Sequence, residues 1–197
     1  MKTKPTLLRG YPRNCSRYIK AIERRLVALE GRSISLRFLP ALTADRRRLY
    51  SNRPHGQPVY AGSFIRKRQI VLDQELEGQP RELARILVHE LFHFAWVRLG
   101  NPARRSYVAL LREEWKRSAR GELGWSAESR KRELSGASMR VSRSPSWRDY
   151  LCESFCDTAA WIYSGVRRHP EYTLAARHRN RRAEWFRAVF QRGTIPI

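Results

Sequence analysis

The sequence has few cysteines and no long hydrophobic run. Its 197 residues include only Cys15, Cys152 and Cys156. Three cysteines are too few for the disulfide framework of a small secreted protein, and an odd number cannot all be paired within one chain. No apolar run approaches the roughly 18 residues that a membrane-spanning helix requires. Residues 1–16 are basic and polar and have no apolar stretch typical of a secretory signal peptide. We therefore expect a cytoplasmic protein that does not engage a membrane.

Acidic residues are also scarce relative to basic ones. Asp and Glu number 18 against 40 Lys and Arg, which gives a formal net charge of +22, and arginine alone supplies 34 of the 40. Such a surface attracts nucleic acid and other polyanions, although a strong arginine bias can also follow from the nucleotide composition of the source. Hydrophobic residues make up 42% of the chain. This content is enough to form a core, which excludes disorder throughout.

The order of predicted elements favours an α+β fold in one domain covering residues 1–197. Helices are expected where apolar residues recur at helical spacing between Pro and Gly signals, over 17–30, 80–99, 103–119, 126–134, 144–164 and 171–191. Strands are expected over 33–39, 59–65 and 69–72, the last two forming a hairpin. Strands that are segregated from helices in this way argue for α+β rather than a doubly wound sheet.

Three segments differ from this pattern in composition. Residues 43–58 are rich in Arg, Asn, Pro and Gly and are expected to form an exposed connection. Residues 121–145 are rich in Gly, Ser and Arg, and we expect them to be a mobile or functional insert. Residues 170–197 are expected to form a basic C-terminal helix.

A histidine pair on the expected helix at 80–99 carries the strongest chemical signal. His89, Glu90 and His93 form the pattern H-E-x-x-H, in which the histidines at i and i+4 project from one helix face and can bind one Zn²⁺. Glu90 lies about 100° around the helix from His89, which suits a base that acts on water beside the metal. The surrounding helix is almost wholly apolar, so unpaired imidazoles would be costly there. The alternative is a pair of core histidines hydrogen-bonded to carbonyls and carboxylates.

A catalytic zinc site needs a third protein ligand and an open position. No histidine follows His93 at the spacing of an extended H-E-x-x-H-x-x-G-x-x-H motif. Glu153 and Asp157 stand at i and i+4 on the expected helix at 144–164. One of these carboxylates can therefore ligate the metal while the other hydrogen-bonds a histidine ring nitrogen. Two other interpretations are a solvated helix face with Arg148 as partner, and a cysteine ligand from the same helix, although small buried thiols are the expected role of those cysteines.

His89-Glu90-x-x-His93, followed on a later helix by Glu153-x-x-x-Asp157, resembles the motif of the gluzincin group of zinc metallopeptidases, particularly its minimal cytosolic members. The resemblance implies a zincin-like fold, in which a small antiparallel sheet packs on a buried active-site helix and further helices follow. It implies that His89, His93 and Glu153 hold Zn²⁺, that Glu90 is the catalytic base, and that Asp157 supports a ligating histidine. The 59 residues between His93 and Glu153 exceed the spacing in the compact members.

The implied function is zinc-dependent hydrolysis of a peptide or protein substrate. Glu90 would take the proton of the attacking water and pass it to the leaving nitrogen. Tyr150, one turn before the expected third ligand, is the first candidate for stabilising the oxyanion, and Tyr163 and His169 follow. For each of these three side chains the alternative is an ordinary core or surface aromatic. The strand at 61–65 is a candidate for binding substrate by strand addition.

Two further hypotheses involve the basic residues. The chain can be a nucleic-acid-binding protein whose histidine motif is structural or vestigial, or a peptidase that is recruited to nucleic acid. Convergence of several basic runs would create a surface for nonspecific binding of polyanions. These runs lie at 46–48, 66–68, 104–105, 130–132 and 177–182. No helix-turn-helix or zinc-finger spacing indicates sequence-specific recognition.

Overall fold

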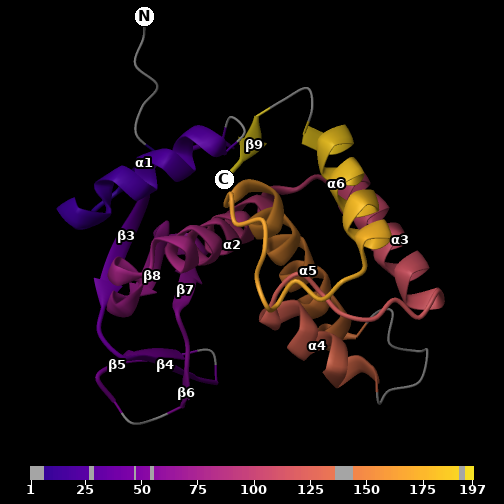
Figure 1. Ribbon diagram of the computed structural model, residues 1–197, viewed down its shortest axis with the longest axis horizontal. Coiled ribbons are helices and arrows are strands. Elements are labelled where there is room, and N and C mark those ends of the chain that lie inside the picture. Colours follow the sequence, from indigo (N-terminus) through magenta and orange to yellow (C-terminus); the bar gives the residue numbers. More distant parts are fainter. Residues whose placement is uncertain (1–6, 27–28, 47, 54–55, 136–143, 191–193) are drawn as a thin grey trace, which may run out of the picture.

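The computed structural model describes residues 7–26, 29–46, 48–53, 56–135, 144–190 and 194–197. Its elements confirm the α+β class (Figure 1). In chain order they are β1 (Leu8–Arg9), η1 (Arg13–Cys15), α1 (Ser16–Arg25), β2 (Leu29–Glu30), β3 (Ile34–Leu39), β4 (Leu42–Asp45), β5 (Arg48–Ser51), β6 (Gln57–Pro58), β7 (Ala61–Phe64), η2 (Ile65–Lys67), β8 (Gln69–Asp73), η3 (Gln74–Gly78), α2 (Pro80–Arg98), α3 (Asn101–Lys116), α4 (Trp125–Ser135), α5 (Pro145–Tyr163), α6 (Ala176–Phe190) and β9 (Ile195–Pro196).

The main sheet is mixed, so the expected antiparallel sheet is wrong in this respect. Its strand order is β1-β3-β8-β7. The strands β1, β3 and β8 are parallel, and only the hairpin of β7 and β8 is antiparallel, with Ser63 opposite Ile70. The hairpin itself was predicted correctly. β3 pairs with β8, the second strand of the hairpin, and not with β7. This pairing is parallel, and it leaves β7 at the edge of the sheet.

Residues 43–58 contain three strands where an exposed connection was expected. β4 pairs with β5 and β6 in a small antiparallel sheet of its own, which lies at the lower left of Figure 1. These strands are short and mostly half-exposed. They therefore lack the apolar alternation from which a strand is recognised in a sequence.

α2 is the central element of the core. Pro80 occupies its first turn, and Arg98 lies in its last turn, where a cation interacts favourably with the helix dipole. The helix lies between the main sheet and α5, and α1 also packs on it (Figure 1). Most of its side chains are buried, including Leu87, Val88 and Phe92. A helix that is apolar on nearly every side is stable only inside the protein.

The described part of the expected insert belongs to the core. α4 begins at Trp125 and packs along α5, and Leu123, Ala127 and Leu134 are buried. Residues 136–143, which also belong to the expected insert, lie outside the described residues. The C-terminal helix is shorter than expected, since α6 covers Ala176–Phe190 and β9 then pairs with β2. Among the helices that the structure describes, none combines the length and apolar character needed to cross a membrane.

Candidate metal centre

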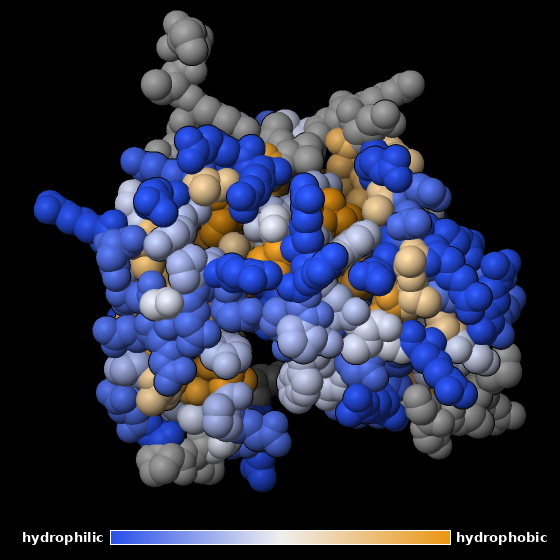
Figure 2. Space-filling model, viewed as in Figure 1, coloured by the Kyte–Doolittle hydropathy of each residue, from blue (hydrophilic) through white to orange (hydrophobic). Residues whose placement is uncertain are grey.

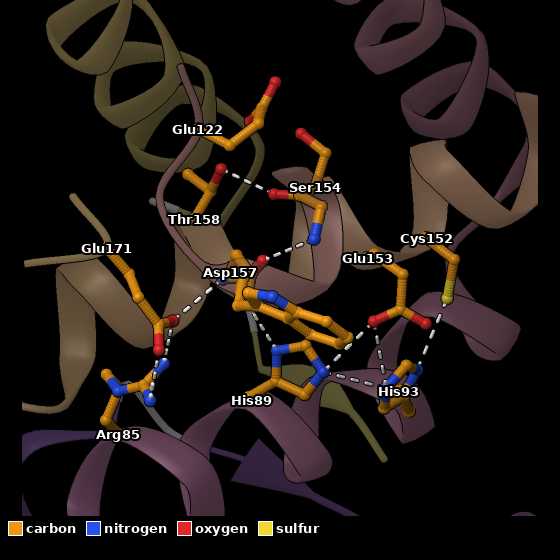
Figure 3. A network of polar contacts seen from close by, with 12 residues as sticks. Arg85, His89, His93, Glu122, Cys152, Glu153, Ser154, Asp157, Thr158 and Glu171 are labelled. Atoms are coloured by element: carbon orange, nitrogen blue, oxygen red, sulfur yellow. Dashed lines mark hydrogen bonds and ion pairs between the residues drawn. The ribbon is translucent and has the colours of Figure 1, made fainter. Parts of the chain in front are cut away.

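Two helices that lie side by side, α2 and α5, bring the predicted metal ligands together (Figure 3). The Nε2 atoms of His89 and His93 are 3.2 Å apart. Glu153 Oε2 lies 3.2 Å from His89 Nε2 and 3.9 Å from His93 Nε2. One ring nitrogen from each histidine and one carboxylate oxygen thus face a common point.

Asp157 fixes the orientation of His89 from the opposite side of the ring. Its Oδ1 lies 2.7 Å from His89 Nδ1. A carboxylate accepts hydrogen bonds, so Nδ1 carries a proton and Nε2 is the nitrogen that faces Glu153 and would bind a metal after losing its own proton. The other oxygen, Oδ2, accepts the backbone N–H of Ala127 at 2.9 Å, at the start of α4. Asp157 therefore makes the hydrogen bond that a metal-binding histidine requires on its second nitrogen.

The carboxylates produce a negative potential at the histidine nitrogens. Burial lowers the pKa of His89, but Asp157 and Glu153 together raise it well above its ordinary value. His93 is also buried, yet its bond to Cys152 and the charges of Glu153 and Glu90 raise its pKa to about 9. Burial raises the pKa of Glu153, whereas its hydrogen bond to His89 and the nearby cations lower it to about 2. The same potential favours a metal cation at this point.

The three ligand atoms fit a zinc ion in spacing and chemistry. With bonds of about 2.0–2.1 Å, a tetrahedral site separates its ligand atoms by roughly 3.3 Å. The separations of 3.2, 3.2 and 3.9 Å are close to that value. Two imidazoles and one carboxylate are a donor set of catalytic zinc sites, in which the fourth position stays open to water or substrate. His89, His93 and Glu153 are thus suited to hold Zn²⁺.

A cavity of about 390 Å³ opens over this cluster. His89, Glu90, His93 and Glu153 line it on the helix side, and Ser63 of β7 lines it on the sheet side. On the face drawn in Figure 2, the surface is hollowed between the lobe of β4–β6 and α4. The ligand cluster is therefore within reach of a molecule that enters from the solvent.

Glu90 lies beside the ligands and is held by the sheet. Its Oε2 accepts a hydrogen bond of 2.6 Å from the Ser63 hydroxyl, which also lies 3.1 Å from the Glu90 carbonyl oxygen. Glu90 is 8% exposed, so the carboxylate is shielded from bulk water but still reaches the cavity. This arrangement leaves its second oxygen, Oε1, to accept a proton.

Tyr150, the expected oxyanion donor, lies away from this cluster. It is 1% exposed, and its hydroxyl donates to Glu122 Oε1 at 2.7 Å. Tyr150, Ser154 and Thr158 form an i, i+4, i+8 stripe of α5 that faces Arg182 instead. The two further candidates are also engaged elsewhere: Tyr163 stacks on Phe92, and His169 pairs with Glu82.

The stripe on α5 contacts a buried group of charges. Arg182 of α6 is fully buried and pairs with Glu114 at 2.6 Å and Glu122 at 2.7 Å. Lys131 adds a second cation at 2.9 Å from Glu122, so two cations balance two carboxylates. Burial raises the pKa of Glu122, but Arg182, Lys131 and the Tyr150 hydroxyl lower it to about 2. This group connects α3, α4 and α6 to the face of α5 that is turned away from Glu153.

Several residues at the site were not predicted from the sequence. Ser63 holds the proposed base, Gly124 and Ala127 contact Asp157, and Arg130 of α4 lines the cavity near Glu153. None belongs to a motif with fixed spacing. Their roles depend on contacts between elements distant in sequence, and the only available signal was that Ser63 lies in the strand expected to bind substrate.

Comparison with known proteins finds no match: no family model, no curated protein and no solved structure matches this chain. A functional conclusion therefore depends on the residues of the site itself.

Proposed function

We propose that the protein is a zinc-dependent peptidase of the gluzincin type, with His89, His93 and Glu153 as metal ligands and Glu90 as general base. The observation that carries this proposal is the convergence of His89 Nε2, His93 Nε2 and Glu153 Oε2 on one point beside a carboxylate and under an open cavity. A bound zinc ion would supply a Lewis acid that polarises the substrate carbonyl and acidifies water.

Glu90 is placed to move protons during hydrolysis. Ser63 hydrogen-bonds Oε2, so Oε1 takes the proton of the attacking water and then delivers it to the leaving nitrogen. Ser63 also fixes the direction of the carboxylate, because its Oγ lies near both the Oε2 and the carbonyl oxygen of Glu90 and donates its one proton to the closer Oε2. Asp157 keeps the proton of His89 on Nδ1 throughout.

β7 is suited to bind an extended peptide. It is an edge strand of the main sheet, paired only with β8 among the strands of that sheet. Ala61, Gly62 and Ser63 line the same cavity as the metal ligands. A peptide that adds to the free edge of β7 would pass across the cluster, held by main-chain hydrogen bonds. This binding mode predicts a peptide or unfolded protein substrate.

Arg130 replaces Tyr150 as our candidate for the oxyanion. It lines the cavity together with Ser126 and Glu153, and its guanidinium also pairs with Glu133 of α4 at 3.1 Å, so it would have to exchange this partner for the substrate oxygen. Its cation lies close enough to lower the pKa of Glu153. A guanidinium at this place stabilises negative charge that develops on a carbonyl oxygen.

The proposal is tested by assaying hydrolysis of an unfolded protein such as casein with zinc-loaded protein. Glu90→Gln preserves the shape of the side chain and removes the base, so we expect kcat to fall by about 10²–10⁴-fold while zinc stays bound. His89→Ala should lose both zinc and activity. Glu184→Gln, on the exposed surface of α6, is the matched control and should be fully active. Hydrolysis by Glu90→Gln at the wild-type rate, or bound zinc with no hydrolysis by the wild type, would contradict the proposal.

We also propose that a second surface binds nucleic acid or another polyanion. The observation that favours it is a cavity of about 520 Å³ lined by Arg25, Arg81, Arg167 and Arg168, with no Asp or Glu among the described residues of its lining. Arginines that converge without acidic neighbours bind phosphate groups well. The formal net charge of +22 also favours a polyanionic partner, and hydrophilic side chains cover most of the face drawn in Figure 2.

Binding of a fluorescent DNA duplex at several salt concentrations tests this second role. Replacing Arg167 and Arg168 together by Gln should reduce the slope of log K against log salt by up to about 2, roughly 0.9 for each lost phosphate contact. The matched control replaces Arg66 and Lys67, two adjacent exposed cations of η2. Equal effects of the two double variants would show that binding follows overall charge and not this cavity.

A further inference from the structure

A second group of potential ligands lies on the far side of His93. Cys152 and Cys156 stand one turn apart on α5, and Cys152 Sγ lies 3.4 Å from His93 Nδ1. The two sulfur atoms and a His93 ring nitrogen all lie within 4.8 Å of one another. Figure 3 shows that Cys152 and Glu153 reach different nitrogens of the His93 ring, Nδ1 and Nε2 respectively. Hydrolysis as proposed above uses Nε2 of His93 and neither of the sulfurs.

We propose that Cys152, Cys156 and His93 Nδ1 form a second metal site, which takes a thiophilic d¹⁰ cation such as Cu(I) or Cd²⁺. Two sulfurs with one imidazole bind thiophilic d¹⁰ metals, Zn²⁺ included, and favour Cu(I) and Cd²⁺ more than the two imidazoles and one carboxylate of the neighbouring cluster do. With the bond lengths of a zinc ion, about 2.0 Å to nitrogen and 2.3 Å to sulfur, tetrahedral coordination separates the two ligand atoms by roughly 3.5 Å. The 3.4 Å between His93 Nδ1 and Cys152 Sγ is close to this value.

The site is accessible from the same cavity as the zinc cluster. Cys152 and His93 both line that cavity, and Cys156 lies fully buried behind them. An incoming ion therefore meets Cys152 and His93 first and Cys156 last. Binding requires both sulfurs and His93 Nδ1 to be deprotonated, so the protons that these groups carry are released to solvent as the cation binds.

His93 links the two sites and makes them compete. A neutral imidazole has one nitrogen lone pair available, because the other nitrogen carries the proton. When Nε2 holds an ion with His89 and Glu153, Nδ1 is protonated and cannot serve the sulfur site. A soft ion bound to Cys152, Cys156 and Nδ1 therefore weakens zinc binding, and so acts as an inhibitor of the proposed peptidase.

Titration of the full-length, metal-free protein with Cd²⁺ tests the sulfur site directly. Thiolate-to-cadmium charge transfer produces an ultraviolet band that nitrogen and oxygen ligands do not give. We expect the band to saturate near one Cd²⁺ per chain. It should be lost in Cys152→Ser and in Cys156→Ala, the second of which keeps the buried position apolar. Cys15→Ser is the matched control, since Cys15 is a buried cysteine at the start of α1, and it should keep the band.

Two further measurements separate this proposal from the peptidase assignment. Glu153→Gln should weaken zinc binding and leave the cadmium band intact, because Glu153 belongs only to the nitrogen and oxygen site. Cd²⁺ added to zinc-loaded wild type should raise the apparent dissociation constant for zinc by about tenfold or more. In Cys152→Ser the increase that Cd²⁺ causes by binding at the sulfur site should disappear. Absence of the band in folded wild type, or its survival in Cys152→Ser, would overturn the sulfur site whether or not the protein hydrolyses peptides.

Discussion

The α-carbon of Gly124 lies directly against the carboxylate of Asp157. A β-carbon at position 124 would come within 2.3 Å of both Cγ and Oδ1 of Asp157, closer than non-bonded atoms approach. Asp157 Oδ1 in turn lies 2.7 Å from His89 Nδ1. The absence of a side chain at position 124 therefore allows the acid to reach the histidine, so the segment that begins α4 positions the proposed metal site.

Gly124→Ala should weaken zinc binding without removing any ligand. The added methyl group pushes the Asp157 carboxylate away from His89, and loss of such a partner costs about 10–100-fold in metal affinity. Gly78→Ala is the matched control, because a β-carbon at position 78 meets no atom within 4 Å. Competition with a chromogenic chelator measures both dissociation constants. Wild-type affinity in Gly124→Ala would show that the position of Asp157 does not matter for the metal.

Arg130→Met should reduce kcat and leave zinc affinity nearly unchanged. The substitution keeps most of the aliphatic side chain and removes the cation from the cavity wall, and loss of one oxyanion donor costs about 10²–10³-fold in kcat. Arg132→Met serves as the control, since Arg132 lies on the same helix with 77% of its side chain exposed. If steady-state kinetics show equal kcat values for the two variants, the assignment of Arg130 is wrong.

Arg182→Met should destabilise the fold rather than change the chemistry. It leaves the buried carboxylates of Glu114 and Glu122 without their main partner, and breaking a buried charge pair in this way costs about 3–5 kcal/mol. Urea denaturation gives the free energy of unfolding. The exposed Arg187 of the same helix provides the control Arg187→Met, which should cost little. A loss below about 1 kcal/mol in Arg182→Met would mean that the group contributes no more than a surface pair.

Stability should fall in acid because of Glu122. Arg182 and Lys131 help to lower its pKa from the ordinary 4.5 to about 2 in the folded state. Since the folded pKa is the lower of the two, the stabilisation is fully present above about pH 4.5 and is lost as the pH falls toward 2. The shift corresponds to about 3 kcal/mol in total. The free energy of unfolding between pH 6 and 3 should therefore fall more steeply in the wild type than in Glu122→Gln, and equal slopes would exclude this cause.

Local signals predicted the helices that carry the site. Pro80 and the apolar sequence after it located α2 within a residue or two, and Ser144 and Pro145 located the start of α5. The position of each helix depends on residues close in sequence, so pattern and capping rules were enough to predict it. The spacing at His89 and His93 likewise fixes a shared helix face, whatever the rest of the chain does.

Long-range contacts could not be predicted in the same way. Tyr150 is one turn from Glu153, so helical spacing alone placed it beside the metal ligands. The buried Arg182 and Glu122 instead draw its hydroxyl to the other side of α5. The parallel pairing of β3 with β8 and the contact of Gly124 with Asp157 also join segments about 30 residues or more apart. The zinc ion and the peptidase activity stay predictions.

Anomalous diffraction at the zinc absorption edge, from crystals of protein that has been dialysed after loading with zinc, would show whether His89, His93 and Glu153 hold a zinc ion. We expect one strong peak about 2.0–2.2 Å from His89 Nε2, His93 Nε2 and Glu153, with the Glu90 carboxylate close by but not bound to the metal. A peak coordinated by other residues, or no peak while His89 and Glu153 keep their positions, would contradict it.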